Sequence, residues 1–256
     1  MRITGLGRLL FAAGFAATGV LTIVTRDVAF LWRPLAQGDA WHDTLAILSG
    51  ALVLAAAIGL LIPRTEQMAS LALAGFLLLR ELVLQLPGVV VHPLVEASWY
   101  SVSENLILLA GAWAIFSLSP REDGALAKYR HVRVGQILFA LALPAIGLSH
   151  MVYLDQTAPL IPAWLPFHVP LAYLTGGAHM AAGVAILIDV MPRLAATLEA
   201  VMVSLFTLLV WVPTVGAHLT NRFDWSEICV STLIAGAAWS VAESFQARAW
   251  NFLRAR

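Results

Sequence analysis

The chain alternates long apolar stretches with short polar turns along nearly its whole length. A helix of roughly 20 apolar residues crosses the ~30 Å hydrocarbon core of a membrane. We therefore expect an all-α, polytopic membrane protein with eight transmembrane helices. The pattern places these spans near residues 8–25, 43–62, 67–91, 101–118, 133–150, 168–190, 194–217 and 227–245.

The composition agrees with a membrane protein and excludes several other classes. Hydrophobic types make up 60% of the 256 residues and charged types 12%, whereas a soluble domain has about 25% charged residues. Lysine and arginine together number 15, as do aspartate and glutamate, so we expect no basic surface for nucleic acid. The one cysteine, Cys229, excludes an intrachain disulfide and a thiolate metal cage, and we expect it to pack as a small hydrophobe.

Basic residues are distributed unevenly between the two sides of the predicted bundle. Eight spans place both termini and the loop 119–132 on one side. The opposite side has only Arg26, Arg33 and Arg222. The side of the termini holds Arg2, Arg8, Arg64, Arg121, Lys128, Arg130, Arg133, Arg193, Arg248, Arg254 and Arg256. The loops of a membrane protein that are rich in lysine and arginine usually lie in the cytoplasm. We therefore expect a multi-pass protein of the inner or plasma membrane with both termini in the cytoplasm.

The sequence also contains an internal duplication. Shifted by 128 residues, the first predicted helix matches the fifth, with Gly7, Phe11 and Gly19 falling on Gly135, Phe139 and Gly147. Shifted by 126 residues, His42, Pro87, His92, Trp99 and Trp113 fall on His168, Pro213, His218, Trp225 and Trp239. The matches predict two tandem four-helix repeats, residues 1–118 and 133–256, joined by a charged cytoplasmic linker over residues 119–132. Because each repeat has an even number of spans, both have the same orientation, and their pseudo-axis follows the membrane normal.

Small residues and prolines give local expectations within the spans. Gly50 in the second span and Gly176 in the sixth predict close helix crossings, because lipid provides no hydrophobic drive for apolar faces to meet. Proline removes a backbone donor, so Pro87 and Pro213 are expected to break the third and seventh helices. The segment from Pro87 to Pro93 is predicted to be a short kinked or re-entrant piece.

These motifs resemble the DoxX-like family of membrane proteins. The resemblance rests on the Gly-x-x-Leu-Phe start of each repeat, on Leu174-Thr-Gly-Gly-Ala-His-Met-Ala-Ala-Gly183, and on Trp225 opening the last helix. Members are usually single four-helix units, and two are fused here. The family includes proteins similar to the membrane part of a thiosulfate:quinone oxidoreductase and others linked to thiol-redox complexes, so the resemblance implies a fold more firmly than a reaction. Members often have an acidic residue where this chain has His179.

Charged residues inside the spans are the first candidates for chemistry, because each is costly at membrane depth. Arg80 and Glu81 lie in the third predicted helix, and Glu104 lies at a comparable depth in the fourth. Arg80 and Glu104 correspond to Phe206 and Val230 in the second repeat, so both charges are absent there. We expect a bridge between Arg80 and Glu104, and a role facing a substrate remains the alternative.

Two histidines are further candidates for binding a ligand. His179 lies eleven residues below His168, ~16 Å into the membrane, and His150 lies at the outer end of the fifth helix. A neutral imidazole can exchange protons near pH 7 or bind a metal or haem. Alternatively, it can form a hydrogen bond to a hydroxyl or a backbone carbonyl within a packed helix interface and have only a structural role. Glu81 is the expected partner of His179.

The remaining outer-boundary histidines form two repeat-related pairs, His42 with His168 and His92 with His218. A pseudo-twofold axis could bring one pair together across the centre, where two imidazoles could bind a metal or haem. The alternative is that histidine is simply stable at a membrane edge. No HExxH motif or carboxylate–histidine cluster predicts a metal site.

Two functional classes remain, and whether the protein is an enzyme stays open. In the first, it is a membrane subunit of a quinone-linked or thiol-redox system that holds a lipidic or small ligand between the repeats. Arg80, Glu81, Glu104, His150 and His179 would supply charge and protons, and the electrons would need a bound cofactor, such as a quinone, or a redox partner protein. In the second, it is a small-molecule carrier; a membrane scaffold is the third alternative. The lipid bilayer is the expected partner in every case, and assembly with further copies of the chain stays open.

Overall fold

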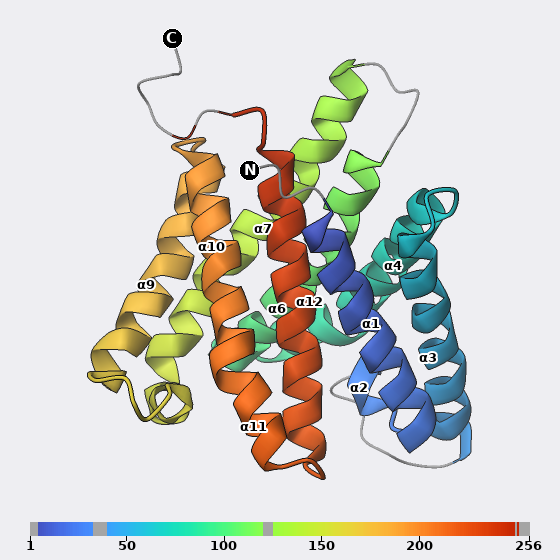
Figure 1. Ribbon diagram of the computed structural model, residues 1–256, viewed down its shortest axis with the longest axis horizontal. Helices are drawn as coiled ribbons and strands as arrows, with labels where there is room; N and C mark the ends of the chain where they lie inside the picture. The colour runs from blue at the N-terminus through green and yellow to red at the C-terminus, as the bar shows by residue number, and fades with distance from the viewer. Residues whose placement is uncertain (1–4, 33–39, 120–124, 249, 251–256) are drawn as a thin grey trace.

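Eight helices of membrane-spanning length make up most of the described chain (Figure 1). The computed structural model describes residues 5–32, 40–119, 125–248 and 250, and within them it has no β-strand. The all-α, polytopic class predicted from the sequence is confirmed. The spans are α1 (Leu6–Thr25), α3 (Ala40–Leu61), α4 (Glu66–Arg80) continued by α5 (Leu86–Val91), α6 (Glu96–Leu118), α7 (Ala125–Val152), α9 (His168–Leu187), α10 (Pro192–Phe206) continued by α11 (Val212–Ala217), and α12 (Arg222–Ser244).

Three short helical pieces complete the outer connections. They are α2 (Ala29–Trp32), α8 (Leu154–Thr157) and the 3₁₀ turn η2 (Ala158–Leu160). Helix α7 begins at Ala125, inside the predicted linker, and residues 120–124 of that linker lie outside the described residues. So do Arg2, Arg33, Arg121, Arg254 and Arg256 of the charge count.

The predicted helix breaks take the form of widened helical turns. A π-helical turn, η1 (Glu81–Gln85), joins α4 to α5, and η3 (Thr207–Trp211) joins α10 to α11. Each precedes a proline, Pro87 or Pro213, whose ring would collide with the carbonyl four residues earlier in a regular α-helix. The segment from Pro87 to Pro93 was expected to be a short kinked or re-entrant piece. Its residues up to Val91 form α5, which follows the π turn η1 and continues the same span.

The secondary structure repeats along the chain. The bounds of α4, η1, α5 and α6 recur, each 126 residues later, in α10, η3, α11 and α12. A loop contact recurs with them. The indole N–H of Trp99 donates to the carbonyl of Pro93 and that of Trp225 to the carbonyl of Leu219, both at 2.9 Å. The two halves therefore share their helix breaks and their outer turns.

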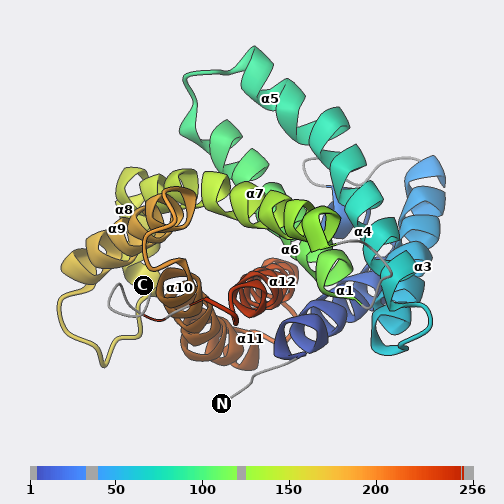
Figure 2. The ribbon, with the colours of Figure 1, turned by 90° about the horizontal axis from the view of Figure 1, so that it is seen from above.

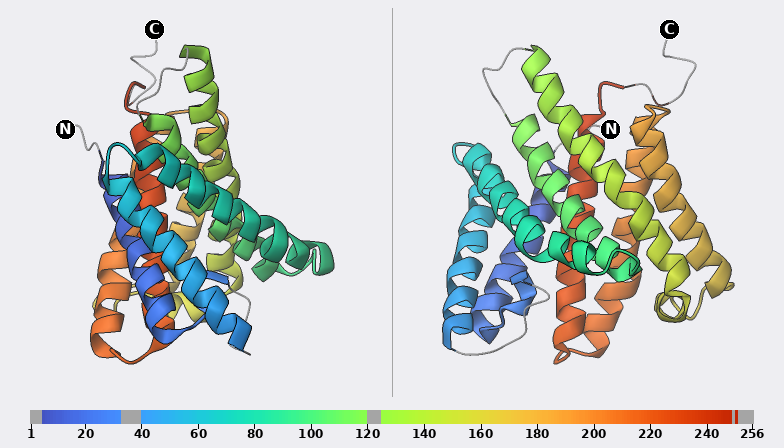
Figure 3. Two further views of the ribbon diagram at one scale, coloured as in Figure 1. Left: turned by 90° about the vertical axis from the view of Figure 1, so that its right-hand side faces the viewer. Right: turned by 180° about the vertical axis from the view of Figure 1, so that it is seen from behind.

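The halves do not close as separate bundles. Helix α1 packs on α3 of its own half and on α12 of the other, while α7 packs on α9 and on α6. Seen from above, α6 and α12 occupy the centre, and α3 and α9 lie at opposite ends (Figure 2). The first helix of each repeat is thus exchanged onto the last helix of the other. Segment α4–α5 leans outward from this body (Figure 3).

Helices α6 and α12 touch at Gly111 and Ala237, which are equivalent positions of the two repeats. A Cβ atom on Gly111 would lie only 2.4 Å from the Cβ of Ala237. Contact between equivalent residues is what a twofold axis running between two equivalent helices produces. Glycines also mark the exchanged contact of α1 with α12, where a Cβ on Gly236 would lie 2.4 Å from the Phe11 nitrogen.

The glycine crossings predicted between neighbouring helices are present in both halves. A Cβ atom on Gly50 of α3 would lie 3.0 Å from the carbonyl oxygen of Gly19 in α1. The matching Cβ on Gly176 of α9 would lie 2.6 Å from the carbonyl oxygen of Gly147 in α7. Both pairs let two backbones approach more closely than any side chain would allow.

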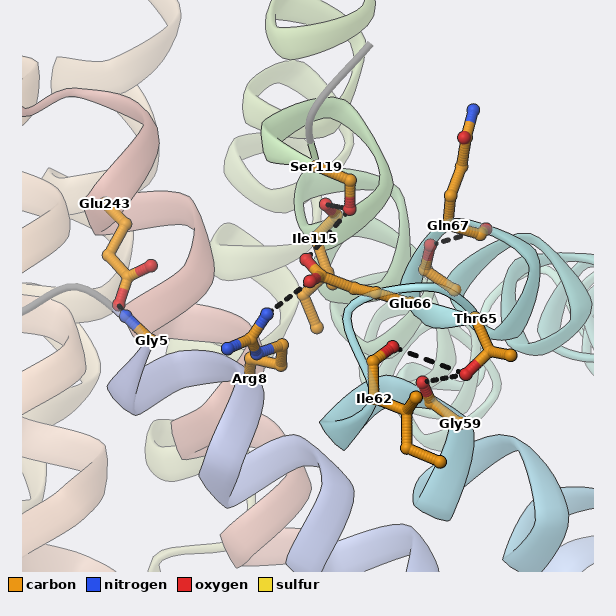
Figure 4. A network of polar contacts seen from close by, with 11 residues as sticks. Gly5, Arg8, Gly59, Ile62, Thr65, Glu66, Gln67, Ile115, Ser119 and Glu243 are labelled. Carbon is orange, nitrogen blue, oxygen red and sulfur yellow. Dashed lines mark hydrogen bonds and ion pairs between the residues drawn. The ribbon is translucent and has the colours of Figure 1, made fainter.

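Polar contacts fasten α1 at the end of the molecule where both termini lie (Figures 1 and 4). Arg8 forms an ion pair with Glu66 at the start of α4, and Glu66 also accepts a hydrogen bond from the Ser119 hydroxyl at 2.9 Å. Glu243 of α12 accepts from the backbone N–H of Gly5 at 2.8 Å, so a carboxylate of the other half caps the start of α1.

A second ion pair fastens α1 to α12 at the opposite end. Asp27, which follows α1 and is completely buried, pairs with Arg222 at the start of α12. Its other carboxylate oxygen accepts from the N–H of Ala29 at 2.9 Å and so begins α2. The exchanged contact is therefore held at both of its ends.

We expect the central crossing to tolerate no added side chain. Gly111→Leu should lower the free energy of unfolding by about 1–3 kcal/mol, because α6 and α12 would have to separate. Gly75→Leu on α4 is the matched control, since a Cβ there meets no atom within 4 Å. It should stay within about 0.5 kcal/mol of the wild type. Unfolding in detergent, followed by circular dichroism, measures both variants, and equal losses would contradict the packing.

Candidate functional site

A cavity of about 330 Å³ opens between the two halves. It lies against α1, the π turn η1, the first half of α6 and the first half of α12, so both repeats contribute to its wall. Apolar side chains from Phe15, Leu108 and Leu233 line part of it. The polar side chains on its wall include Arg80, Gln85, Ser101, Glu104, Ser226 and Cys229.

Arg80 and Glu104, predicted to lie together, both line this cavity. Arg80 ends α4 and is only 9% exposed, while Glu104 is half-buried on α6. Val230, the second-repeat counterpart of Glu104, lies on the same wall. The structure thus brings to one cavity wall the basic and the acidic side chain that the sequence placed at a comparable depth, and a direct bond between them stays a prediction.

Glu81 has a structural partner. Its carboxylate accepts a hydrogen bond from the Asn105 amide at 2.6 Å, and the same amide nitrogen lies 2.9 Å from the carbonyl of Leu77. In the second repeat, the hydroxyls of Thr207 and Ser231 lie 2.7 Å apart at the equivalent two positions. A polar contact therefore joins the π turn to the last helix in both halves, and in the first half Glu81 makes that contact.

His179 lies in a separate cluster and pairs with Glu199. Its Nδ1 is 2.6 Å from Oε1 of Glu199 on α10, with side-chain exposures of 3% and 1%. The prediction that Glu81 is its partner is wrong, because Glu81 belongs to the other repeat and is bound to Asn105. Glu199 was missed from the sequence. The sequence held a signal for this pair, because α9 and α10 are consecutive helices joined by a short turn. His179 lies eight residues before the end of α9 and Glu199 seven residues after the start of α10, so both lie at a similar depth.

His150 lies beside this pair. The ring centres of His150 and His179 are 5.0 Å apart, and the Phe206 ring lies 6.2 and 6.3 Å from them. His150 Nδ1 is 2.9 Å from the carbonyl oxygen of Ile146, one turn earlier on α7. The five predicted ligand-binding residues therefore divide among the cavity (Arg80, Glu104), an interhelix contact (Glu81) and a histidine cluster (His150, His179).

The outer-boundary histidines do not meet at the axis. His42 and His168 lie at the start of α3 and α9, and His92 and His218 follow the ends of α5 and α11. Figure 2 places each of these helix pairs on opposite sides of the central α6–α12 contact. Of the two alternatives, the meeting of one pair at the centre is therefore not what the structure has, because α6 and α12 themselves fill the centre. Within the described residues, no group of three or more His, Cys, Asp or Glu side chains is arranged to hold a metal.

Searches of protein-family models, of curated proteins and of solved structures find no match to this chain. The resemblance to DoxX-like proteins therefore rests on the quoted motifs alone, and function has to be argued from the cavity and the clusters themselves.

The assignment of Glu81 to a structural contact with Asn105 can be tested directly. Asn105→Ala should lower the free energy of unfolding by about 1–3 kcal/mol, because it leaves a buried carboxylate without its donor. The double change Glu81→Thr with Asn105→Ser copies the second repeat and should recover most of that loss. Thermal unfolding in detergent measures both. If the double variant is no more stable than Asn105→Ala, the two halves do not use equivalent contacts here.

Proposed function

We propose that this membrane protein binds a small molecule with a hydrogen-bond-accepting or anionic head group in the cavity between its halves. The supporting observation is the buried guanidinium of Arg80 on the wall of a cavity at membrane depth. Placing arginine inside a span costs ~2.5–3.5 kcal/mol on insertion scales, and such residues usually mark a substrate path or a binding site. A ligand in this cavity would meet that positive charge on the wall.

The lining favours a quinone-type head group within this class. Arg80 and Gln85 offer hydrogen-bond donors to carbonyl oxygens, and Phe15, Leu108 and Leu233 offer an apolar surface to a ring. Glu104 places a carboxyl group on the same wall. A bound quinone would supply the redox chemistry. The protein would then act as the membrane subunit of a quinone-linked or thiol-redox system, with electrons delivered by a partner protein.

A small-molecule carrier is the second candidate. Transporters built from parallel repeats bind substrate near the membrane midplane between the repeats, often where helices are interrupted. Here the cavity lies between the halves, and its wall includes Leu84 and Gln85 of the π turn η1. The interrupted helix supports this alternative.

Binding of a short-tailed benzoquinone to the protein in lipid nanodiscs tests the proposal. The double change Arg80→Phe with Glu104→Val gives the first repeat the residues that the second repeat has at both positions. It should weaken binding at least tenfold, about 1.4 kcal/mol, by removing the polar contacts to the head group. His92→Ala, exposed after the end of α5, is the control and should bind like the wild type.

Undiminished binding by the double variant would contradict the assignment of the cavity. If the quinone does not bind, but proteoliposomes accumulate a labelled organic anion in an Arg80-dependent way, the carrier function replaces the redox one.

We also infer that the end carrying both termini faces the cytoplasm of an inner or plasma membrane. Figure 1 places the start of α1, the end of α6, the start of α7 and the end of α12 at one end of the molecule, and the sequence has most of its basic residues in or beside the segments at this end. Lys128→Cys and Glu96→Cys, each with the buried Cys229 changed to alanine, report the two sides. In intact cells an impermeant maleimide should label only Glu96→Cys, and labelling of Lys128→Cys alone would reverse the orientation.

A further inference from the structure

A second polar site lies inside the membrane and apart from the cavity. It consists of His150 on α7, His179 on α9 and Glu199 on α10, which we call the imidazole–carboxylate cluster. None of the three lines the cavity. Buried ionisable groups at this depth are costly unless they are paired, and they commonly belong to proton or ion pathways.

The short contact between His179 and Glu199 fixes where a further proton can bind. A neutral His179 that donates from Nδ1 to an ionised Glu199 leaves the pair with one negative charge. Adding one proton makes the pair neutral, either as imidazolium with carboxylate or as imidazole with carboxylic acid. In both forms Nε2 of His179 carries a hydrogen. That nitrogen is buried and has no hydrogen-bond partner among the described atoms.

His150 connects this nitrogen to the outer side. It is half-buried, it lies two residues before the end of α7, and its ring is adjacent to that of His179. With Nδ1 donating to the Ile146 carbonyl, its own Nε2 is free to accept a proton and pass one on. Phe206 covers both rings.

The first repeat shows that the fold does not need this cluster. The positions equivalent to His150, His179 and Glu199 are Thr22, Val53 and Leu73. Thr22 donates to the backbone of its own helix, and Val53 and Leu73 belong to the apolar core. Hence the second repeat has three titratable residues at positions where the first repeat has a threonine, a valine and a leucine.

We propose that the imidazole–carboxylate cluster is a proton-binding site, loaded from the outer side through His150. One proton enters at Nε2 of His150 and transfers to Nε2 of His179. It neutralises the charge that His179 and Glu199 carry together. A further titratable residue among the described residues of this half is Glu227 of α12, one helical turn outward of Ser231, which bonds Thr207. The site is independent of the proposed ligand in the cavity.

Proton uptake by the purified protein in nanodiscs tests the site. Between about pH 9 and about pH 5, the wild type should take up one proton per chain more than the double variant His179→Val with Glu199→Leu, which copies the first repeat. Glu199→Gln keeps the shape and should lose the same proton, since a buried imidazolium without a counter-charge is too costly. His92→Val removes an exposed histidine and shows that a change of one proton is resolved.

The kinetics test the route. His150→Thr, the residue of the first repeat, should keep the uptake but slow it at least tenfold after a pH jump, followed with an indicator dye. Equal uptake by the wild type and Glu199→Gln would overturn the site, because His179 would then titrate alone or the pair would keep a fixed proton. An unchanged rate in His150→Thr would overturn the route through His150.

Discussion

The close contact of α6 and α12 is the constraint on which the rest of the molecule depends. Because Gly111 has no side chain, the two helices approach until a Cβ atom there would lie only 2.4 Å from that of Ala237. With the last helices of both repeats occupying the centre, neither first helix can complete its own bundle around them. Each instead packs on the outer flank of the other repeat's last helix, α1 on α12 and α7 on α6. Glycine, alanine and serine make these approaches feasible in lipid, where tight packing rather than hydrophobicity holds helices together.

The exchange also explains where the polar sites lie. The cavity has walls from α1, the α4–α5 segment and α6 of the first repeat and from α12 of the second, so it exists only because the halves are interlocked. The imidazole–carboxylate cluster lies instead among α7, α9 and α10. The two halves share one framework, repeated at 126 residues. In the first half this framework carries a guanidinium and a carboxylate on the cavity wall, and in the second half it carries the imidazole–carboxylate cluster, the proposed proton site. Duplication followed by divergence of buried residues accounts for the difference.

The sequence predicted the features that depend on short-range pattern. Span number followed from apolar run length, and the helix breaks followed from Pro87 and Pro213. Counting helical rise placed Arg80 and Glu104 at a comparable depth, and both line one cavity. The sequence could not predict which helices pack together, because nearly every face of these helices is apolar and lipid does not distinguish one such face from another. Hence the exchange of α1 and α7 was not foreseen, nor the position of the paired histidines away from the axis. The partner of His179 was missed because Glu199 was not compared in depth across the hairpin of α9 and α10.

Cross-linking of α1 tests the exchanged arrangement most directly. With Cys229→Ala as background and a protease site placed in the 119–124 segment, Leu6→Cys is combined either with Glu243→Cys or with its first-repeat equivalent, Ser117→Cys. The account predicts that oxidation links Leu6→Cys to Glu243→Cys, since Glu243 caps the start of α1. The two halves would then remain joined on a denaturing gel after cleavage. Efficient linkage of Leu6→Cys to Ser117→Cys, with separation of the halves in the other variant, would mean that each repeat closes on itself and would contradict the account.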